Sequence, residues 1–142
     1  MKQIAIKIFL IMLSSALLAF HAQAKDCDPK QPSFTVDGVE KWGQKTAVSI
    51  FEESSKSTLT KNEHIEIQGI PIKTLIAPYG QQGSLTISTC DNTSLNIDVQ
   101  KILTESPEYY LILARRDFFK LVLGSNPKPR LKQISSLQLN TK

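Results

Sequence analysis

The chain has 142 residues, of which 41% are hydrophobic and 21% are charged, and its formal net charge is +4. This length suits one compact domain with a single hydrophobic core and leaves little room for a second. So small a basic excess does not indicate a nucleic-acid-binding protein, because such proteins concentrate many cations on one face.

Residues 1–24 have the pattern of a secretory signal peptide. Lys2 and Lys7 give a positively charged start, an apolar stretch follows, and Ala22-Gln23-Ala24 offers small residues before a cleavage point. The alternative is a membrane anchor, but its uninterrupted apolar core is shorter than the roughly 20 residues that a bilayer requires. We therefore expect residues 25–142 to form a single periplasmic or secreted domain without stable membrane insertion. Removing two lysines leaves 15 basic against 13 acidic residues, a net charge of +2.

The chain has only two cysteines, Cys27 and Cys90. A secreted protein reaches compartments in which disulfides persist, so an even cysteine count favours a bridge over a redox or metal pair. Lipidation of Cys27 is disfavoured because the charged pair Lys25-Asp26 precedes it, where a lipidation signal has small neutral residues. We expect Cys27 and Cys90 to be bonded to each other, with two independent buried thiols as the alternative.

Short apolar segments and turn signals alternate in the first half of the mature chain. Asp37-Gly38 predicts a turn, and the spacing of Ser49 and Glu52 has the form of a helix capping box. An alternation of polar and apolar residues ends at Gly69, as in a half-buried strand. The predicted elements are strands at Ser33–Val36 and Thr46–Ile50, a helix at Ile50–Ser57 and a strand at His64–Gln68.

The second half has clearer signals. Pro71 suits the first turn of a helix that would end before Pro78, and Asp98 is a good cap for a second helix. Asp91-Asn92 marks the clearest hairpin in the chain. The predicted strands are Thr86–Cys90, Ser94–Ile97, Tyr109–Ala114 and Phe118–Leu123, and a rigid loop with Pro127 and Pro129 precedes a last strand at Leu131–Leu139.

The order of these elements over residues 33–139 resembles the oxidoreductase molybdopterin-binding domain, which has the sulfite-oxidase fold. The segments that carry the resemblance are Glu66–Ile76, Tyr79-Gly80, Leu85–Ser94 with Asp91-Asn92 at its turn, and Ile112–Ala114. In that family a glycine-valine-proline-leucine turn leads into a short helix, a strand and an aspartate-glycine-tyrosine hairpin. The resemblance implies an α+β fold, a single mixed β domain with short helices.

One departure from the family bears directly on function. In its catalytic members, a cysteine thiolate ahead of the glycine-proline turn binds molybdenum. The segment between Trp42 and Gly69 has no cysteine, and Cys90 comes after the turn. The resemblance therefore implies a reduced relative that has lost its metal ligand and holds no cofactor. A residual molybdopterin-dependent oxidoreductase is the alternative.

Other catalytic arrangements receive little support from the mature chain. His64 is its only histidine, which excludes a site of two histidines, and the alternation of its segment predicts that it faces solvent. Two carboxylate pairs, Glu52-Glu53 and Glu63 with Glu66, are the residue type that glycoside hydrolysis uses, but they are more readily explained as surface charges. We predict no catalytic residues and no metal site.

The last third of the chain has the strongest charge asymmetry. Consecutive arginines at a strand end are expected to project to opposite faces, so that only one joins any patch. A stiff Pro-Lys-Pro-Arg loop is suited to meet a carboxylate or a phosphate. We predict Arg115, Arg116, Lys128 and Arg130 as ligand-binding residues, with a solvated basic face as the alternative. The full set of charges in this segment is Arg115, Arg116, Lys120, Lys128, Arg130 and Lys132 against Asp117.

Four aromatic residues in the same region, Tyr109, Tyr110, Phe118 and Phe119, are predicted to be core and edge residues first and a stacking surface for a ring-bearing ligand second. These observations predict a secreted, non-catalytic binding module. It would sense or present a small anionic or aromatic ligand, or bind an envelope protein, and would not bind nucleic acid. A secreted inhibitor or adaptor protein is the alternative.

Overall fold

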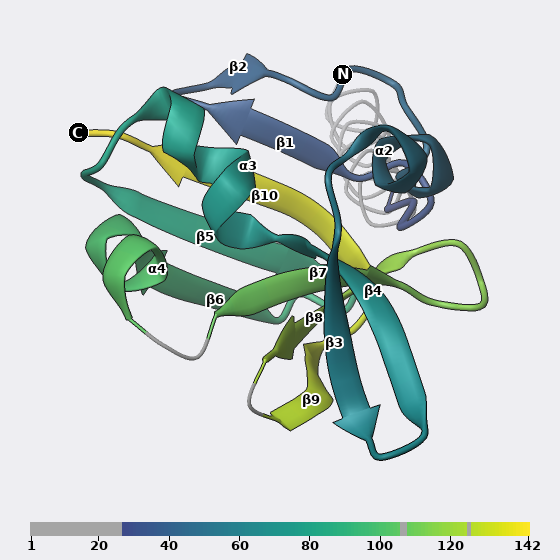
Figure 1. The fold of residues 1–142 in the computed structure, drawn as a ribbon. Helices are drawn as coiled ribbons and strands as arrows, with labels where there is room; N and C mark the ends of the chain where they lie inside the picture. The colour runs from purple at the N-terminus through teal and green to yellow at the C-terminus, as the bar shows by residue number, and fades with distance from the viewer. Residues whose placement is uncertain (1–26, 106–107, 125) are drawn as a thin grey trace, which may run out of the picture.

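The computed structural model describes residues 27–105, 108–124 and 126–142, so the predicted signal peptide lies outside the described residues. The described chain folds into two five-stranded sheets joined by a few short helices (Figure 1). Every strand pairing within them is antiparallel except that of β1 with β10. The prediction of a mixed α and β fold is therefore confirmed at this level.

The first sheet joins the two ends of the described chain. Its strand order is β2-β1-β10-β5-β6, and the parallel pair of β1 and β10 lies at its centre (Figure 1). The predicted hairpin around Asp91-Asn92 is confirmed, and Asn92 takes the left-handed conformation that such a turn requires, with φ of +67°. The strands are β1 (Ser33–Val36), β2 (Val39–Glu40), β5 (Ser84–Thr89), β6 (Ser94–Asp98) and β10 (Ile134–Asn140).

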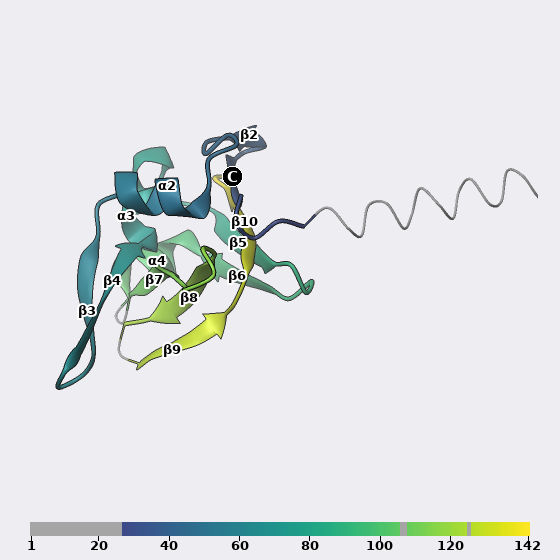
Figure 2. The ribbon, with the colours of Figure 1, turned by 90° about the vertical axis from the view of Figure 1, so that its right-hand side faces the viewer.

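The second sheet has the strand order β3-β4-β7-β8-β9. Its β3–β4 hairpin extends away from the rest of the molecule, as both views show (Figures 1 and 2). The strands predicted at Tyr109–Ala114 and Phe118–Leu123 are present as β7 and β8, which pair antiparallel. The strands are β3 (Ser57–Asn62), β4 (Ile65–Pro71), β7 (Tyr109–Leu113), β8 (Phe119–Leu123) and β9 (Asn126–Leu131).

The helices are α2 (Ala47–Glu53), α3 (Ile72–Ile76), the 3-10 turn η1 (Ala77–Tyr79) and α4 (Val99–Thr104). The helix that begins at the predicted Asp98 cap is confirmed, because the Asp98 side chain accepts the N–H of Gln100 at 2.9 Å. The helix that was expected over Ile50–Ser57 begins earlier. Its cap is Thr46, which accepts the Ser49 N–H at 3.2 Å.

The prediction of a strand at Thr46–Ile50 was wrong, because the helix α2 begins within this segment. Ala47 and Ile50 are both buried, and their spacing of three places them on one face of a helix. The apolar residues of this segment fit helical spacing, and the threonine cap starts the helix. The structure also begins a strand at Ser57, where the helix was expected to end.

The proline-containing segment before Leu131 is strand β9 and not a loop. β9 is an edge strand, where proline is tolerated because N–H groups that face away from the sheet form no ladder hydrogen bond. Gln133 has φ of +56° and separates β9 from β10, so the chain passes from the second sheet to the first over residues 132–133 (Figure 2). The last strand begins at Ile134, not at Leu131.

One cluster of buried apolar residues draws on both sheets and on all three α-helices. Phe119 is fully buried, as expected of a core aromatic, and its ring lies 6.0 Å from that of Trp42, while Tyr109, Tyr110 and Phe118 are half-buried. Central members from the strands are Leu85, Ile87, Leu137, Ile70, Leu111 and Leu121.

The predicted Cys27–Cys90 disulfide is confirmed. It joins Cα atoms 5.6 Å apart across a sequence separation of 63 residues. Cys90 lies directly after β5, and its N–H donates to the Gln133 carbonyl oxygen at 3.2 Å. The bridge therefore ties the start of the described chain to the junction of β5, β9 and β10.

Candidate functional site

A pocket of about 420 Å³ lies between the β7–β8 turn and the β9–β10 junction. We call it the basic pocket, because four of its nine lining residues are cationic. Those four are Arg115, Arg116, Lys120 and Lys132, and the others are Ile112, Leu113, Ala114, Phe118 and Gln133.

The local backbone explains why both arginines reach this pocket. The Asp117 N–H donates to the Ala114 carbonyl oxygen at 3.0 Å, and the Ala114 N–H donates to the Phe118 carbonyl oxygen at 2.9 Å. Asp117 has φ of +65°, as is typical of the last residue in a three-residue hairpin loop. Arg115 and Arg116 therefore lie in the loop and not on a strand. The expectation that only one of them joins a patch was wrong, because strand alternation does not apply there.

The cations of the basic pocket have no ion-pair partner among the described residues. None of its described lining residues is acidic, and none of its four cations forms an ion pair or a side-chain hydrogen bond with a described residue. Elsewhere, Lys45 pairs with Glu53 at 2.6 Å and Lys73 with Glu108 at 3.7 Å. Like charges that gather without partners repel one another and raise the local concentration of anions. The basic pocket is therefore suited to an anion.

Two further pockets are lined in part by residues of β9. The middle pocket, of about 220 Å³, includes Lys132 and Arg130, and the apolar pocket, of about 420 Å³, includes Arg130 and Leu131. The remaining residues of the middle pocket are Thr89, Asp91, Thr93, Pro129 and Leu131. Those of the apolar pocket are Thr93, Ser94, Leu95, Tyr109 and Leu123.

The four predicted ligand-binding residues are thus divided by the structure. Arg115 and Arg116 lie together, and Arg130 lines the two neighbouring pockets. Lys128 is exposed and is not among the described lining residues of any of the three pockets. Lys120 and Lys132 line the basic pocket but were outside the predicted set, although both belong to the charge asymmetry that the sequence shows.

Asp91 is the one acidic side chain among the described lining residues of the three pockets. Its carboxylate accepts hydrogen bonds from the hydroxyl of Thr89 and from the N–H of Thr93, the second at 3.1 Å. The bond from Thr89, followed by those from Thr93, holds the pKa of Asp91 below its ordinary value. Asp91 is therefore ionised at neutral pH and is already hydrogen-bonded within its own turn.

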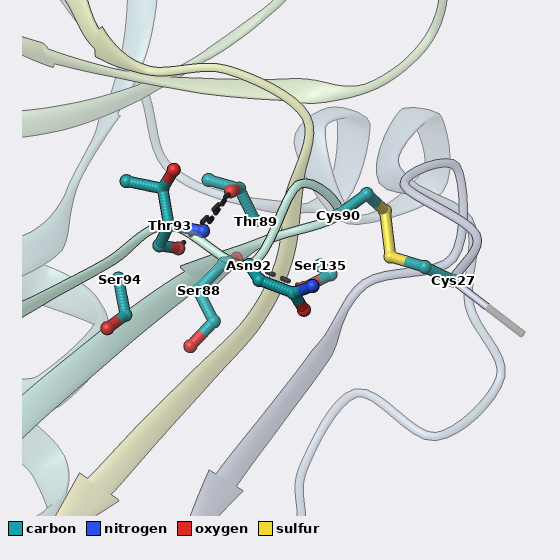
Figure 3. Close-up of a pocket in the computed structure, with 8 residues that line it drawn as sticks. All are labelled: Cys27, Ser88, Thr89, Cys90, Asn92, Thr93, Ser94 and Ser135. Carbon is teal, nitrogen blue, oxygen red and sulfur yellow. Dashed lines mark hydrogen bonds between the residues drawn. A yellow bond between two sulfur atoms is a disulfide. The ribbon is translucent and has the colours of Figure 1, made fainter. Parts of the chain in front are cut away.

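A fourth pocket, of about 380 Å³, lies beside the disulfide (Figure 3). Its lining is neutral, and the Ser135 hydroxyl donates to the Ser88 carbonyl oxygen at 3.1 Å. It offers hydroxyl and amide groups but no charge. The lining residues are Cys27, Cys90, Ser88, Thr89, Asn92, Thr93, Ser94 and Ser135.

Residues considered for catalysis lie away from these pockets. His64 is in the turn between β3 and β4 and not on a strand, and Glu53 is at the end of α2, paired with Lys45. No group of three or more His, Cys, Asp or Glu residues in the described ranges could hold a metal ion. Within the same ranges, no helix is long and apolar enough to cross a membrane.

The residues present do not fit the molybdenum centre of the catalytic members of the molybdopterin-binding family that the sequence resembles. Such a centre needs a cysteine thiolate, and the chain's only two cysteines are bonded to each other. Comparison with known proteins does not assign a family, since no protein-family model and no curated protein matches the chain.

Proposed function

We propose that this protein is a non-catalytic binding module that binds a small anionic ligand in the basic pocket. The observation that carries the proposal is the gathering of four unpaired cations around one pocket, with no acid among its described lining residues. Arginine binds carboxylates and phosphates through paired hydrogen bonds, so Arg115 and Arg116 supply the recognition. Ile112, Ala114 and Phe118 supply apolar surface for the ligand's carbon skeleton.

We further propose an extracytoplasmic location and a sulfite-oxidase-like fold. The signal-peptide pattern of residues 1–24 and the disulfide support the location, because disulfides persist in oxidising compartments. The resemblance over residues 33–139 supports the fold. Under this proposal, the chain is a reduced relative of a molybdopterin-binding domain, in which ligand binding takes the place of redox chemistry.

The proposal is tested by calorimetric titration of the purified protein with citrate and with inorganic phosphate at low and at high salt. We expect saturable binding that weakens as salt is added, because the contacts are between exposed charges. Arg116→Ala is expected to weaken binding about tenfold, the loss of a charge-assisted hydrogen bond.

The matched control is Lys128→Ala, which removes the same charge from an exposed residue outside the described pocket linings. We expect it to change affinity by less than about twofold, because screening limits the effect of a distant charge. Equal effects of the two substitutions, or no saturable binding of either anion, would contradict the proposal.

A further inference from the structure

The apolar pocket is separate from the basic pocket. Tyr109 of the apolar pocket and Ile112 of the basic pocket are three positions apart on β7, and side chains along a strand alternate between its two faces. Their partners on β8, Leu123 and Lys120, lie on the same two faces in turn. The two pockets share no described lining residue. A ligand of the apolar pocket is therefore held by a different set of side chains.

The apolar pocket draws its lining from both sheets. Leu95 comes from β6, the edge strand of the first sheet, while Tyr109 and Leu123 come from β7 and β8 of the second. These three side chains are half-buried, and Leu131, which also lines the pocket, is buried. A volume of about 420 Å³ is in the range of pockets that hold small molecules. The lining suits the hydrocarbon part of a ligand, because its burial removes apolar surface from water.

Arg130 is the one charged residue among the described residues that line this pocket. On β9, Leu131 lies opposite Leu121 and Pro129 lies opposite Val122, so Arg130 has no partner residue on β8. Such a shift in register redirects a side chain out of the ordinary alternation. The exposed guanidinium forms no ion pair and no hydrogen bond with a described residue. The pocket therefore combines an apolar lining with a single cation that is open to a ligand.

Asp91 does not neutralise Arg130, although both residues line the middle pocket. No ion pair joins them in the described structure. The Asp91 carboxylate already accepts hydrogen bonds from the hydroxyl of Thr89 and from the N–H of Thr93. The guanidinium is therefore left for an anion from outside the chain.

Tyr109 adds a second polar group to the apolar pocket. Its hydroxyl forms no hydrogen bond with a described residue, whereas the hydroxyl of the neighbouring Tyr110 donates to Glu108 at 3.1 Å. A phenol O–H and a guanidinium both donate to carboxylate oxygens. An apolar pocket with a few polar groups that fix the orientation of the ligand is the usual composition of a small-molecule site.

We propose that the apolar pocket binds a small amphipathic carboxylate, a molecule with a hydrocarbon chain or ring and one carboxylate group. The hydrocarbon contacts Leu95, Leu123 and Leu131, and the carboxylate accepts hydrogen bonds from Arg130 and Tyr109. The described lining has one cation and no acid, which matches a single negative charge. An organic cation would meet Arg130 as a like charge. This second site does not rest on the proposed function, because it uses none of the residues of the basic pocket.

The experiment is calorimetric titration of the purified protein with octanoate, octylammonium and acetate. Octanoate and octylammonium have an eight-carbon chain and opposite charges, and acetate has the carboxylate without the chain. We expect saturable binding of octanoate and roughly tenfold weaker binding of octylammonium, because the charge next to Arg130 is reversed. Acetate is expected to show no saturable binding, since it buries almost no apolar surface.

Two variants test the polar contacts, and each has a matched control. Arg130→Ala is expected to weaken octanoate roughly fivefold, whereas Lys128→Ala removes the same charge two residues away, outside the described linings. Tyr109→Phe keeps the ring and is expected to weaken octanoate about threefold through the lost hydrogen bond. Tyr110→Phe removes a hydroxyl from the opposite face of β7. Each control should change affinity by less than about twofold.

Several outcomes would overturn the inference. These are no saturable binding of octanoate, equal binding of octanoate and octylammonium, or equal effects of Arg130→Ala and Lys128→Ala. Equal effects of the two phenylalanine variants would overturn the role of Tyr109. Displacement of octanoate by saturating citrate at matched ionic strength, or its loss in Arg116→Ala, would place the carboxylate in the basic pocket instead. Failure of citrate and phosphate to bind, with octanoate binding dependent on Arg130, would overturn the proposed function alone.

Discussion

The carboxylate of Asp37 accepts two hydrogen bonds from Thr141, one from the backbone N–H at 2.9 Å and one from the hydroxyl at 2.5 Å. The two residues are 104 positions apart in the chain. Asp37 stands in the turn after β1 with φ of +49°, and its own N–H donates to the Leu139 carbonyl oxygen at 2.8 Å. The turn after β1 is thus fastened to the residue that follows the last strand, β10.

These bonds predict a dependence of stability on acid. The side-chain bond from Thr141, followed by its backbone bond, lowers the pKa of Asp37 in the folded protein. The bonds therefore stabilise the fold fully above the ordinary carboxyl pKa, and this contribution is lost as the pH falls through the lowered value. Asp37→Asn is expected to lower the free energy of unfolding at neutral pH. The variant should also lose less of this free energy than the wild type when the solution is acidified. Urea denaturation over a pH series measures both.

Asp117→Asn is the control for that experiment. Asp117 is also left-handed, with φ of +65°, but its side chain forms no hydrogen bond with a described residue. Asparagine tolerates this conformation as well as aspartate does, so both substitutions leave the backbone unstrained. If Asp37→Asn and Asp117→Asn gave the same pH profile, the bonds to Thr141 would not be the cause.

Loss of the disulfide is expected to destabilise the protein strongly. A cross-link across 63 residues lowers the entropy of the unfolded chain. In the chain-entropy model this contributes about 4 kcal/mol to the free energy of unfolding. The double variant Cys27→Ser, Cys90→Ser should lose roughly that amount in urea denaturation, and a reduced wild-type sample should behave alike. A loss below about 1 kcal/mol would show that the unfolded chain is already compact.

Local signals predicted much of this fold from the sequence. The Asp91-Asn92 turn, the Asp98 cap and the cysteine pair each depend on a few residues with strong preferences, and the structure contains all three features. Strand β3 was missed because Leu59 is the one apolar residue in its sequence, so no alternation of apolar and polar residues marks it, and it depends on pairing with β4. β9 was missed because its prolines are typical of a loop, and only its edge position permits them.

The site was predictable in charge but not in geometry. The run of cations in the last third is visible in the sequence, and most of them line the basic or the middle pocket. That Arg115 and Arg116 share a pocket depends on the hairpin loop that holds them. Arg130 lines the middle and apolar pockets, whereas Lys128 does not, and β9 has a register shift here that no local preference indicates.

The pKa of the Tyr110 phenol is expected to depend on Glu108. Burial raises the pKa of Tyr110, and the hydrogen bond from its hydroxyl to Glu108 at 3.1 Å raises it further, as does the Glu108 charge. Glu108→Gln is expected to lower this pKa while burial keeps it above the ordinary value. Spectrophotometric titration of the phenolate measures the change, and Tyr110→Phe identifies the signal among the chain's three tyrosines.

Glu105→Gln serves as the control for this titration, because Glu105 has no side-chain contact with Tyr110 in the described structure. Since the pKa of Tyr110 is raised in the folded protein, its stabilising contribution is present at neutral pH and is lost as the pH rises through the raised value. Glu108→Gln should therefore reduce the contribution of the raised Tyr110 pKa to the free energy of unfolding in moderately alkaline solution. An unchanged titration curve would show that Glu108 does not act on the phenol.

Gly83 is the glycine whose replacement should cost most. It has φ of +111°, and a Cβ atom there would lie 1.8 Å from the carbonyl oxygen of Asn140 at the end of β10. Its own carbonyl oxygen accepts the Val99 N–H at 2.9 Å, at the start of α4. Gly83→Ala must therefore displace the backbone of Asn140 and Thr141 or move away from it, and we expect it to lower the free energy of unfolding by about 3 kcal/mol or more.

Gly43→Ala separates the clash from the conformational strain. Gly43 is also left-handed, with φ of +63°, but a Cβ atom there would meet nothing within 4 Å. Its replacement should therefore show only the cost of the backbone conformation, about 1 kcal/mol. Urea denaturation of both variants gives the comparison, and if Gly83→Ala is recovered only as insoluble protein, that outcome agrees with the clash. Equal, small losses at the two positions would mean that β10 moves aside freely, which its central place in the first sheet argues against.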